Sequence, residues 1–147
     1  MVTLHGKSET ELVVIGLEPG DMLLESIQKA IDKYGIDNGA IVSGYGTLKS
    51  CTMHYVTHTG FPPTDKLFTL DDKPMELLSM NGTIAQRKPH IHISLSIGEK
   101  EVYGGNLENN SEILYLGEVV IMKFAQPKML RVKDEARKIV LLQGASE

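Results

Sequence analysis

Residues 88–108 read KPHIHISLSIGEKEVYGGNLE, and this stretch decides the fold class. In its first half apolar residues alternate with polar ones, a period of two that is typical of a β-strand with one face in the core. His90 and His92 therefore project from the same polar face, with Cβ atoms about 6.6 Å apart, because a strand rises roughly 3.3 Å per residue. Two imidazoles at this spacing can converge on one ion. The stretch predicts a sheet with a polar site on one face.

The rest of the chain predicts further strands and one helix. Residues 11–17 form a β-rich run that ends in a Pro-Gly turn, and a helix with one apolar stripe follows from Asp21 to Tyr34, with Gly35 as its left-handed stop. Strands are expected at residues 39–44, 49–57, 66–70, 75–80, 83–86, 90–97, 101–105 and 113–124. Residues 129–143 fit a terminal hairpin slightly better than a helix. Short links between strands predict mainly antiparallel pairing.

One helix among many strands predicts a single domain, residues 1–147, of the α+β class. The expected architecture is a mainly antiparallel, twisted sheet with one principal helix packed on it. A helix of about 14 residues is about 21 Å long, because the rise is 1.5 Å per residue, so it covers only part of such a sheet. The uncovered apolar surface favours self-association, which would bury it against another copy.

Charge and composition narrow the function. The net charge is −4 and the sequence pI is about 5.7, which does not favour sequence-independent binding to DNA phosphates. The basic residues near the end are interrupted by Asp134 and Glu135 and are interpreted as a solvated surface. No signal peptide or long apolar run is found, so a cytoplasmic location without membrane contact is expected. The one cysteine, Cys51, is expected to be a buried apolar residue.

Other side chains are candidates to join the two histidines. His54 lies in the strand of residues 49–57, and a neighbouring strand about 4.8 Å away brings such a side chain within reach. Zn²⁺ or Fe²⁺ takes three protein ligands in a catalytic site. Glu76 is a candidate oxygen ligand, or the carboxylate that fixes a histidine tautomer. The residues indicate a metal or small-ligand site at His54, His90 and His92, or a solvated strand whose imidazoles bond locally.

Small residues near the histidines are candidate ligand contacts. Ser94 lies on the same strand face as His92, and Gly104-Gly105-Asn106 follows the next strand. Glycine lets backbone approach a ligand closely, although it also serves turns and bulges. Residues 43–47, SGYGT, are expected to join two strands, and their glycines have the same alternative roles. No nucleophile-elbow pattern supports a Ser-His-Asp hydrolase.

The order of these motifs resembles the plant and prokaryote conserved domain, the PPC family. The resemblance rests on residues 18–56, 74–84, 88–108 and 113–121, which read EPGDMLLESIQKAIDKYGIDNGAIVSGYGTLKSCTMHYV, PMELLSMNGTI, KPHIHISLSIGEKEVYGGNLE and ILYLGEVVI. It implies a mixed sheet with a few helices, assembled as a homotrimer. The family is often labelled DNA-binding, but the plant members' AT-hook run Arg-Gly-Arg-Pro is absent from this sequence.

The stand-alone bacterial and archaeal members are the more similar ones. Several carry a His-x-His strand followed by Gly-Gly-His, which implies a three-histidine metal site. Here the matching triplet ends in Asn106, whose side-chain oxygen is a poor ligand for zinc. This departure favours His54 as the residue that completes a site with His90 and His92.

Three functions remain open from the sequence. The first is a homotrimeric module that holds a divalent metal, zinc or iron, or an anionic small molecule near a subunit boundary. The second is a DNA-binding regulatory protein, as the family label suggests. The third is a metal-dependent enzyme of unknown substrate, with bound water as nucleophile and Glu76 as proton acceptor.

Overall fold

The computed structural model of the protein describes residues 1–145. Its elements, in chain order, are β1 Thr10–Leu17, α1 Leu23–Tyr34, β2 Asn38–Leu48, β3 Cys51–Val56, β4 Asp65–Leu70, β5 Met75–Ala85, β6 Lys88–Ile97, β7 Glu101–Leu107, β8 Ile113–Phe124, β9 Met129–Asp134 and β10 Ile139–Gly144. The α+β class is confirmed, because a single helix accompanies ten strands in the described part of the chain.

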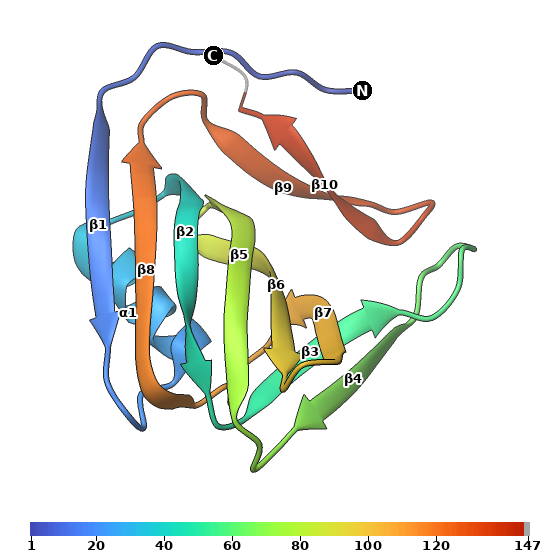
Figure 1. Cartoon of the computed structure of the whole chain (residues 1–147). Helices are drawn as coiled ribbons and strands as arrows, with labels where there is room; N and C mark the ends of the chain where they lie inside the picture. The colour runs from blue at the N-terminus through green and yellow to red at the C-terminus, as the bar shows by residue number, and fades with distance from the viewer. Residues whose placement is uncertain (146–147) are drawn as a thin grey trace.

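The strands build one large sheet and one hairpin. Eight of them lie in the order β1-β8-β2-β5-β6-β7-β3-β4, and every neighbouring pair is antiparallel. The sheet is strongly twisted, so β3 and β4 run at a steep angle to β8 (Figure 1). β9 and β10 form a separate two-stranded hairpin beyond the ends of β2 and β5. The predicted antiparallel sheet and terminal hairpin are both confirmed.

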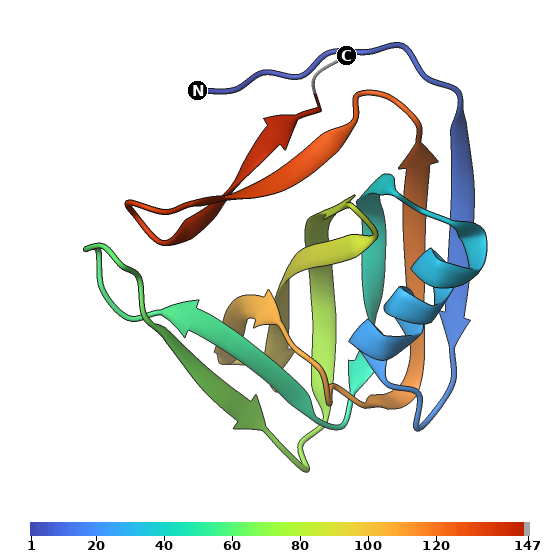
Figure 2. The same cartoon turned by 180° about the vertical axis from the view of Figure 1, so that it is seen from behind.

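The helix covers one face of the sheet, on the side of β1, β8 and β2 (Figure 2). Leu23, Ile27 and Ile31 follow one another at four-residue spacing and are fully buried against the sheet. Gly35 ends the helix in the left-handed conformation, at φ 58°, where a residue without a Cβ carries no steric penalty. The helix predicted from spacing is thus confirmed, at 12 residues.

The opposite face of the sheet, called here the outer face, is not covered by the helix. Apolar side chains that alternate with core residues are exposed on it, and they include Leu12, Val14, Val42, Leu78 and Val102. The exposed surface agrees with the expectation that one helix cannot cover this sheet. Whether another copy of the chain covers it remains a prediction.

Two strand boundaries predicted from the sequence are wrong. The expected strands at residues 75–80 and 83–86 are one continuous strand, β5, because Asn81 and Gly82 stay in register with β6 instead of turning. Residues 43–47 were expected to join two strands, yet they lie inside β2, which pairs with β5 and β8 on either side. In both places glycine accommodates close approach of neighbouring strands within the sheet.

Two further expectations concern Cys51 and the membrane. Cys51 is fully buried, and burial raises the pKa of its thiol to about 11, so it is a packed side chain as the sequence indicates. Among residues 1–145, no helix is both long and apolar enough to cross a bilayer.

Candidate functional site

A row of polar side chains crosses four strands on the outer face. His54 on β3 lies opposite Asn106 on β7, Asn106 lies opposite His92 on β6, and His92 lies opposite Asn81 on β5. Residues directly opposite one another have Cβ atoms about 4.5–5.5 Å apart, so each member of this histidine row adjoins the next. The row is therefore a product of strand register, since its members are far apart in the sequence.

His90 and His92 converge as the sequence predicts. Both point to the outer face of β6, while Ile91 between them and Ile93 after them are buried in the core. The Nε2 atoms of the two rings are 3.1 Å apart and share a hydrogen bond. Two ligands of a tetrahedral zinc ion lie about 3.3 Å apart when each Zn–N bond is about 2.0–2.1 Å. The two nitrogens thus suit a single metal ion.

His54 is held by partners on both ring nitrogens. Its Nδ1 lies 2.6 Å from Glu108 Oε1, and its Nε2 lies 3.2 Å from the side-chain nitrogen of Asn106. With Nδ1 protonated toward the carboxylate, Nε2 becomes an acceptor directed along the row. A carboxylate on the far nitrogen is the arrangement that orients a metal-binding imidazole and raises its basicity. In this structure that nitrogen contacts Asn106.

An arginine from the terminal hairpin adjoins the row. Arg131 on β9 donates from Nη2 to Thr83 Oγ1 at 2.8 Å, and Thr83 lies directly opposite His90. Burial lowers the pKa of His90, and the charge of Arg131 and the two other histidines lowers it further. His90 is therefore held toward the neutral form, which is the form that binds metals.

Not every predicted residue belongs to the histidine row. Glu76 lies opposite Ser96 at the other end of β5, five residues before Asn81, and so roughly 16 Å from the row along the strand. It lines a recess with Tyr45 and Leu78 instead. The structure does not bring Glu76 to the histidines, because Glu76 and the row lie at different positions along β5.

The predicted small residues lie beside the row. Ser94 is on the same face as His92 and bonds through Oγ to Ser79 Oγ at 2.8 Å. Gly104 lies opposite Ser94, and Gly105 lies opposite Ile93. A Cβ added to Gly105 would lie 2.8 Å from the carbonyl oxygen of His54, closer than such atoms normally approach. The role of Gly105 visible here is therefore to let β7 pack closely on β3.

Within residues 1–145, no three side chains of the types His, Cys, Asp and Glu are placed to hold one metal ion together. His90 and His92 provide two convergent nitrogens, and the neighbour of His92 toward His54 is Asn106, an oxygen donor. Amide oxygen suits a harder ion such as Mn²⁺ better than zinc. The residues present fit a metal with two imidazole ligands.

Sequence reasoning missed four residues of this region: Asn81, Thr83, Glu108 and Arg131. Glu108 follows Asn106 by two positions, so strand alternation indicates the same face, and this signal could have identified it. Thr83 required knowledge of the register between β5 and β6. Arg131 carried no signal, because its position depends on how the terminal hairpin packs on the sheet.

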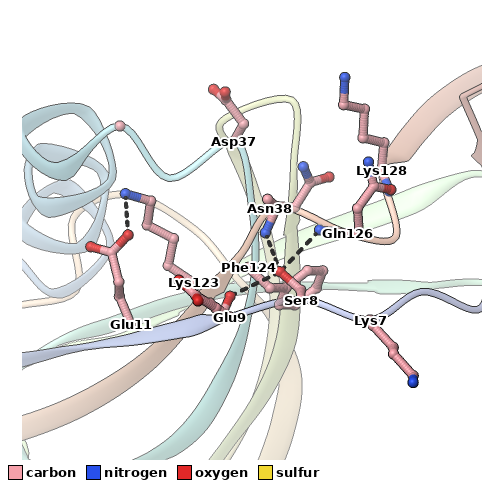
Figure 3. A pocket seen from close by; sticks show the side chains of 12 residues that line it. Lys7, Ser8, Glu9, Glu11, Asp37, Asn38, Lys123, Phe124, Gln126 and Lys128 are labelled. Atoms are coloured by element: carbon pink, nitrogen blue, oxygen red, sulfur yellow. Dashed lines mark hydrogen bonds and ion pairs between the residues drawn. The ribbon is translucent and has the colours of Figure 1, made fainter.

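A recess of about 550 Å³ lies away from these residues, between the N-terminal segment and the end of β8 (Figure 3). Its lining carries charges of both signs, and the ion pair between Lys123 and Glu11, 3.0 Å long, neutralises part of them. Ser8 in its wall accepts a hydrogen bond from the backbone of Ala125. None of the predicted site residues lines this recess.

The structure thus defines a protein class: a twisted antiparallel sheet with one helix on its inner face and a histidine row on its outer face. The chain belongs to the Plants and Prokaryotes Conserved (PCC) domain family, whose model matches residues 5–125. The family resemblance inferred from the sequence is therefore confirmed. The matched range ends before β9, so the terminal hairpin lies outside it.

Solved structures share the fold over nearly the whole chain. A plant- and prokaryote-conserved protein of Pyrococcus horikoshii is 25% identical, with all of both chains covered and a TM-score of 0.80. A metal-containing protein of Archaeoglobus fulgidus is 24% identical, with 97% of this chain and 99% of that chain covered and a TM-score of 0.79. A Bacteroides thetaiotaomicron protein, named provisionally as DNA-binding, is 13% identical, with 93% and 97% covered and a TM-score of 0.77. At the lower identities this likeness shows the fold alone.

A curated relative is a much longer protein. The bifunctional protein GlmU of a Synechococcus strain is 22% identical over 120 residues, which are 82% of this chain. The chain spans only 18% of the length of that protein. The likeness therefore concerns one segment of GlmU.

Proposed function

We propose that the protein is a homotrimeric module that binds a divalent metal or a small ligand at the histidine row. His90 and His92 are the primary ligands, and His54, oriented by Glu108, completes the site. The single observation that carries this proposal is the 3.1 Å separation of the two Nε2 atoms, since two exposed rings are brought together on one strand face. The metal-containing name of the Archaeoglobus neighbour agrees with it.

The third ligand is the open feature of this site. Asn106 separates His54 from His92 in the row, and its side-chain nitrogen forms a hydrogen bond with His54 Nε2. Rotation of the Asn106 amide would expose either its oxygen or the nitrogen of His54 toward the ion. Both choices leave positions for water or a ligand, as open metal sites do.

Elemental analysis of protein purified without a histidine tag tests the metal part of the proposal. We expect a stoichiometric first-row metal in the wild-type protein and its loss from the double variant His90→Ala, His92→Ala. The matched control is His58→Ala, because His58 is an exposed loop residue outside the row. Metal content that is equal in all three proteins would contradict the assignment.

The homotrimer rests on the family resemblance and on the uncovered outer face. Exposed Leu78 lies on β5, which the row crosses, and exposed Val42 lies on the adjacent β2, so a second copy packed there would bury apolar area beside the row. Sedimentation equilibrium of the tag-free protein tests the assembly. A mass of one 16.2 kDa chain at micromolar concentration would contradict it.

DNA binding is the weaker alternative. It rests on the names of fold neighbours, of which a Ralstonia eutropha protein is another provisionally DNA-binding case, at 19% identity over 88% of this chain with a TM-score of 0.72. Three basic side chains of the terminal hairpin are paired with its own acids, through Arg137–Asp134, Lys138–Glu135 and Lys133–Glu135. Titration of duplex DNA separates the two functions, because phosphate contacts give an affinity that falls steeply with salt.

The enzyme alternative loses its proton acceptor, since Glu76 lies far from the histidines.

A further inference from the structure

Arg131 enters the site from outside the region that defines the family. It lies on β9, beyond residues 5–125, and the hairpin positions it through a hydrogen bond from its backbone N–H to Gln86 Oε1, 2.9 Å long. Gln86 follows β5 directly, so this bond docks β9 on the end of the strand that carries Thr83. The arginine therefore lies outside the range that the family model matches.

The guanidinium of Arg131 forms no ion pair within residues 1–145. Its Nη2 donates to the hydroxyl of Thr83 at 2.8 Å and to the carbonyl of Thr83 at 3.5 Å. Its Nε is buried and has no hydrogen-bond partner among the described residues. No carboxylate of residues 1–145 lies within 4.0 Å of this guanidinium, in contrast to Arg137 on the same hairpin, which is 2.6 Å from Asp134. A partly buried cation with unused donors favours an anion beside it.

The guanidinium of Arg131 lies next to the histidines. Thr83 is the direct cross-strand neighbour of His90, so the guanidinium adjoins the convergent pair His90 and His92. Glu108 is the carboxylate that contacts the row, and it bonds the ring nitrogen of His54 that faces away from Asn106. Within residues 1–145, no carboxylate forms a hydrogen bond or ion pair with the side chains of Arg131, His90 or His92.

From this geometry we infer that the site binds an oxyanion, the carboxylate or phosphate group of a small molecule, with Arg131 as its anchoring residue. The inference rests on the proposed function, because it names the ligand class of the same site. The planar guanidinium presents paired N–H donors that match the oxygens of such a group. His90 and His92 contact the same anion, either directly as donors or through a metal ion that they hold.

Isothermal titration of the full-length protein with inorganic phosphate and with acetate tests this inference. We expect at least one anion to bind the wild-type protein, both as purified and after dialysis against a chelator, or only as purified if the metal takes part. Arg131→Gln is expected to weaken binding about tenfold or more, because a charge-assisted hydrogen bond is lost. Arg131→Lys keeps the charge but loses the fork, so we expect an intermediate affinity.

Arg137→Gln is the matched control, since it removes a paired arginine from the same hairpin. We expect its affinity to remain within about twofold of the wild type, because surface ion pairs contribute little. Thermal unfolding of each variant verifies that the fold is retained. The anion that binds more tightly distinguishes a phosphate ligand from a carboxylate ligand.

Two results would overturn the inference: neither anion binds the wild-type protein, or Arg131→Gln binds as tightly as the wild type. Metal content, measured on the same samples, separates this failure from failure of the proposed function. A wild-type protein that contains metal but binds neither anion overturns the anion site alone. A protein with neither metal nor anion affinity overturns both.

Discussion

Successive residues of β6 point to opposite faces of the sheet, and the side chains on the two faces make different interactions. Ile91, Ile93 and Leu95 point into the core and are almost completely buried. His90 and His92, which alternate with these residues, point to the outer face, where their cross-strand neighbours are polar side chains of β5 and β7. Burial therefore fixes the first set, whereas strand register brings the second set together. The contrast predicts that stability and the proposed binding can be altered separately on one strand.

Ile93→Ala and His92→Ala give the largest contrast between the faces. Ile93 is 4% exposed, and removal of such a buried aliphatic side chain costs about 2–5 kcal/mol of the free energy of unfolding. His92 is exposed, so His92→Ala is expected to change stability of the metal-free protein by only about 0.5 kcal/mol. Urea denaturation measures both. Equal losses would show that the outer face also carries the fold.

The glycine pair on β7 gives the next largest contrast. Gly105→Ala places a methyl group 2.8 Å from the His54 carbonyl and 3.2 Å from Met53 Cβ, so we expect a loss of about 1–3 kcal/mol from overpacking. Gly104→Ala places it on the outer face, where the nearest atom is the Ile93 oxygen at 3.1 Å. Urea midpoints of the two variants provide the measurement. If Gly104→Ala were the more disruptive variant, the proposed packing of β7 on β3 would be incorrect.

Cys51 gives the smallest expected effect, because the raised pKa of its thiol does not change the free energy of unfolding at neutral pH. Burial raises the pKa of its thiol from 9.0 to about 11, so at pH 8 the folded protein should react with iodoacetamide about 100-fold more slowly than the unfolded chain. The folded state keeps a proton that the unfolded chain loses above pH 9. The free energy of unfolding therefore falls as the pH rises from about 9 toward 11. Rapid alkylation of the folded protein would show that Cys51 is accessible.

The fold was predictable to the extent that it depends on local alternation. Strand β8 was predicted at its observed bounds, because buried and exposed residues alternate along it and turn residues flank it. β5 was divided in two, because Asn81-Gly82 reads as a turn pair in isolation, although β2 and β6 on either side keep it extended. Neighbouring strands therefore overrode the local turn preference.

The candidate site was predictable only where one strand supplied it. His90 and His92 share β6, so their convergence follows from the two-residue period. The sheet order β5-β6-β7-β3 is not the order of the sequence, and it inserts Asn106 between His92 and His54. The register of β5 and β6 places Glu76 five residues away from the row, and the packing of the terminal hairpin places Arg131 beside Thr83. Such positions depend on long-range pairing, which a single sequence does not reveal.

The joint between β3 and β7 consists of two residue pairs, Met53 with Leu107 and His54 with Asn106. All other neighbouring strands of the large sheet share longer ladders, so the β3–β4 ribbon is attached at its narrowest seam where the histidine row crosses it. A ligand that contacts both His54 and His92 would link the strands on the two sides of this seam. By mass action, occupancy would then raise the protection of β3 and β4 amides from hydrogen exchange, while those of β1 and β8 would hardly respond.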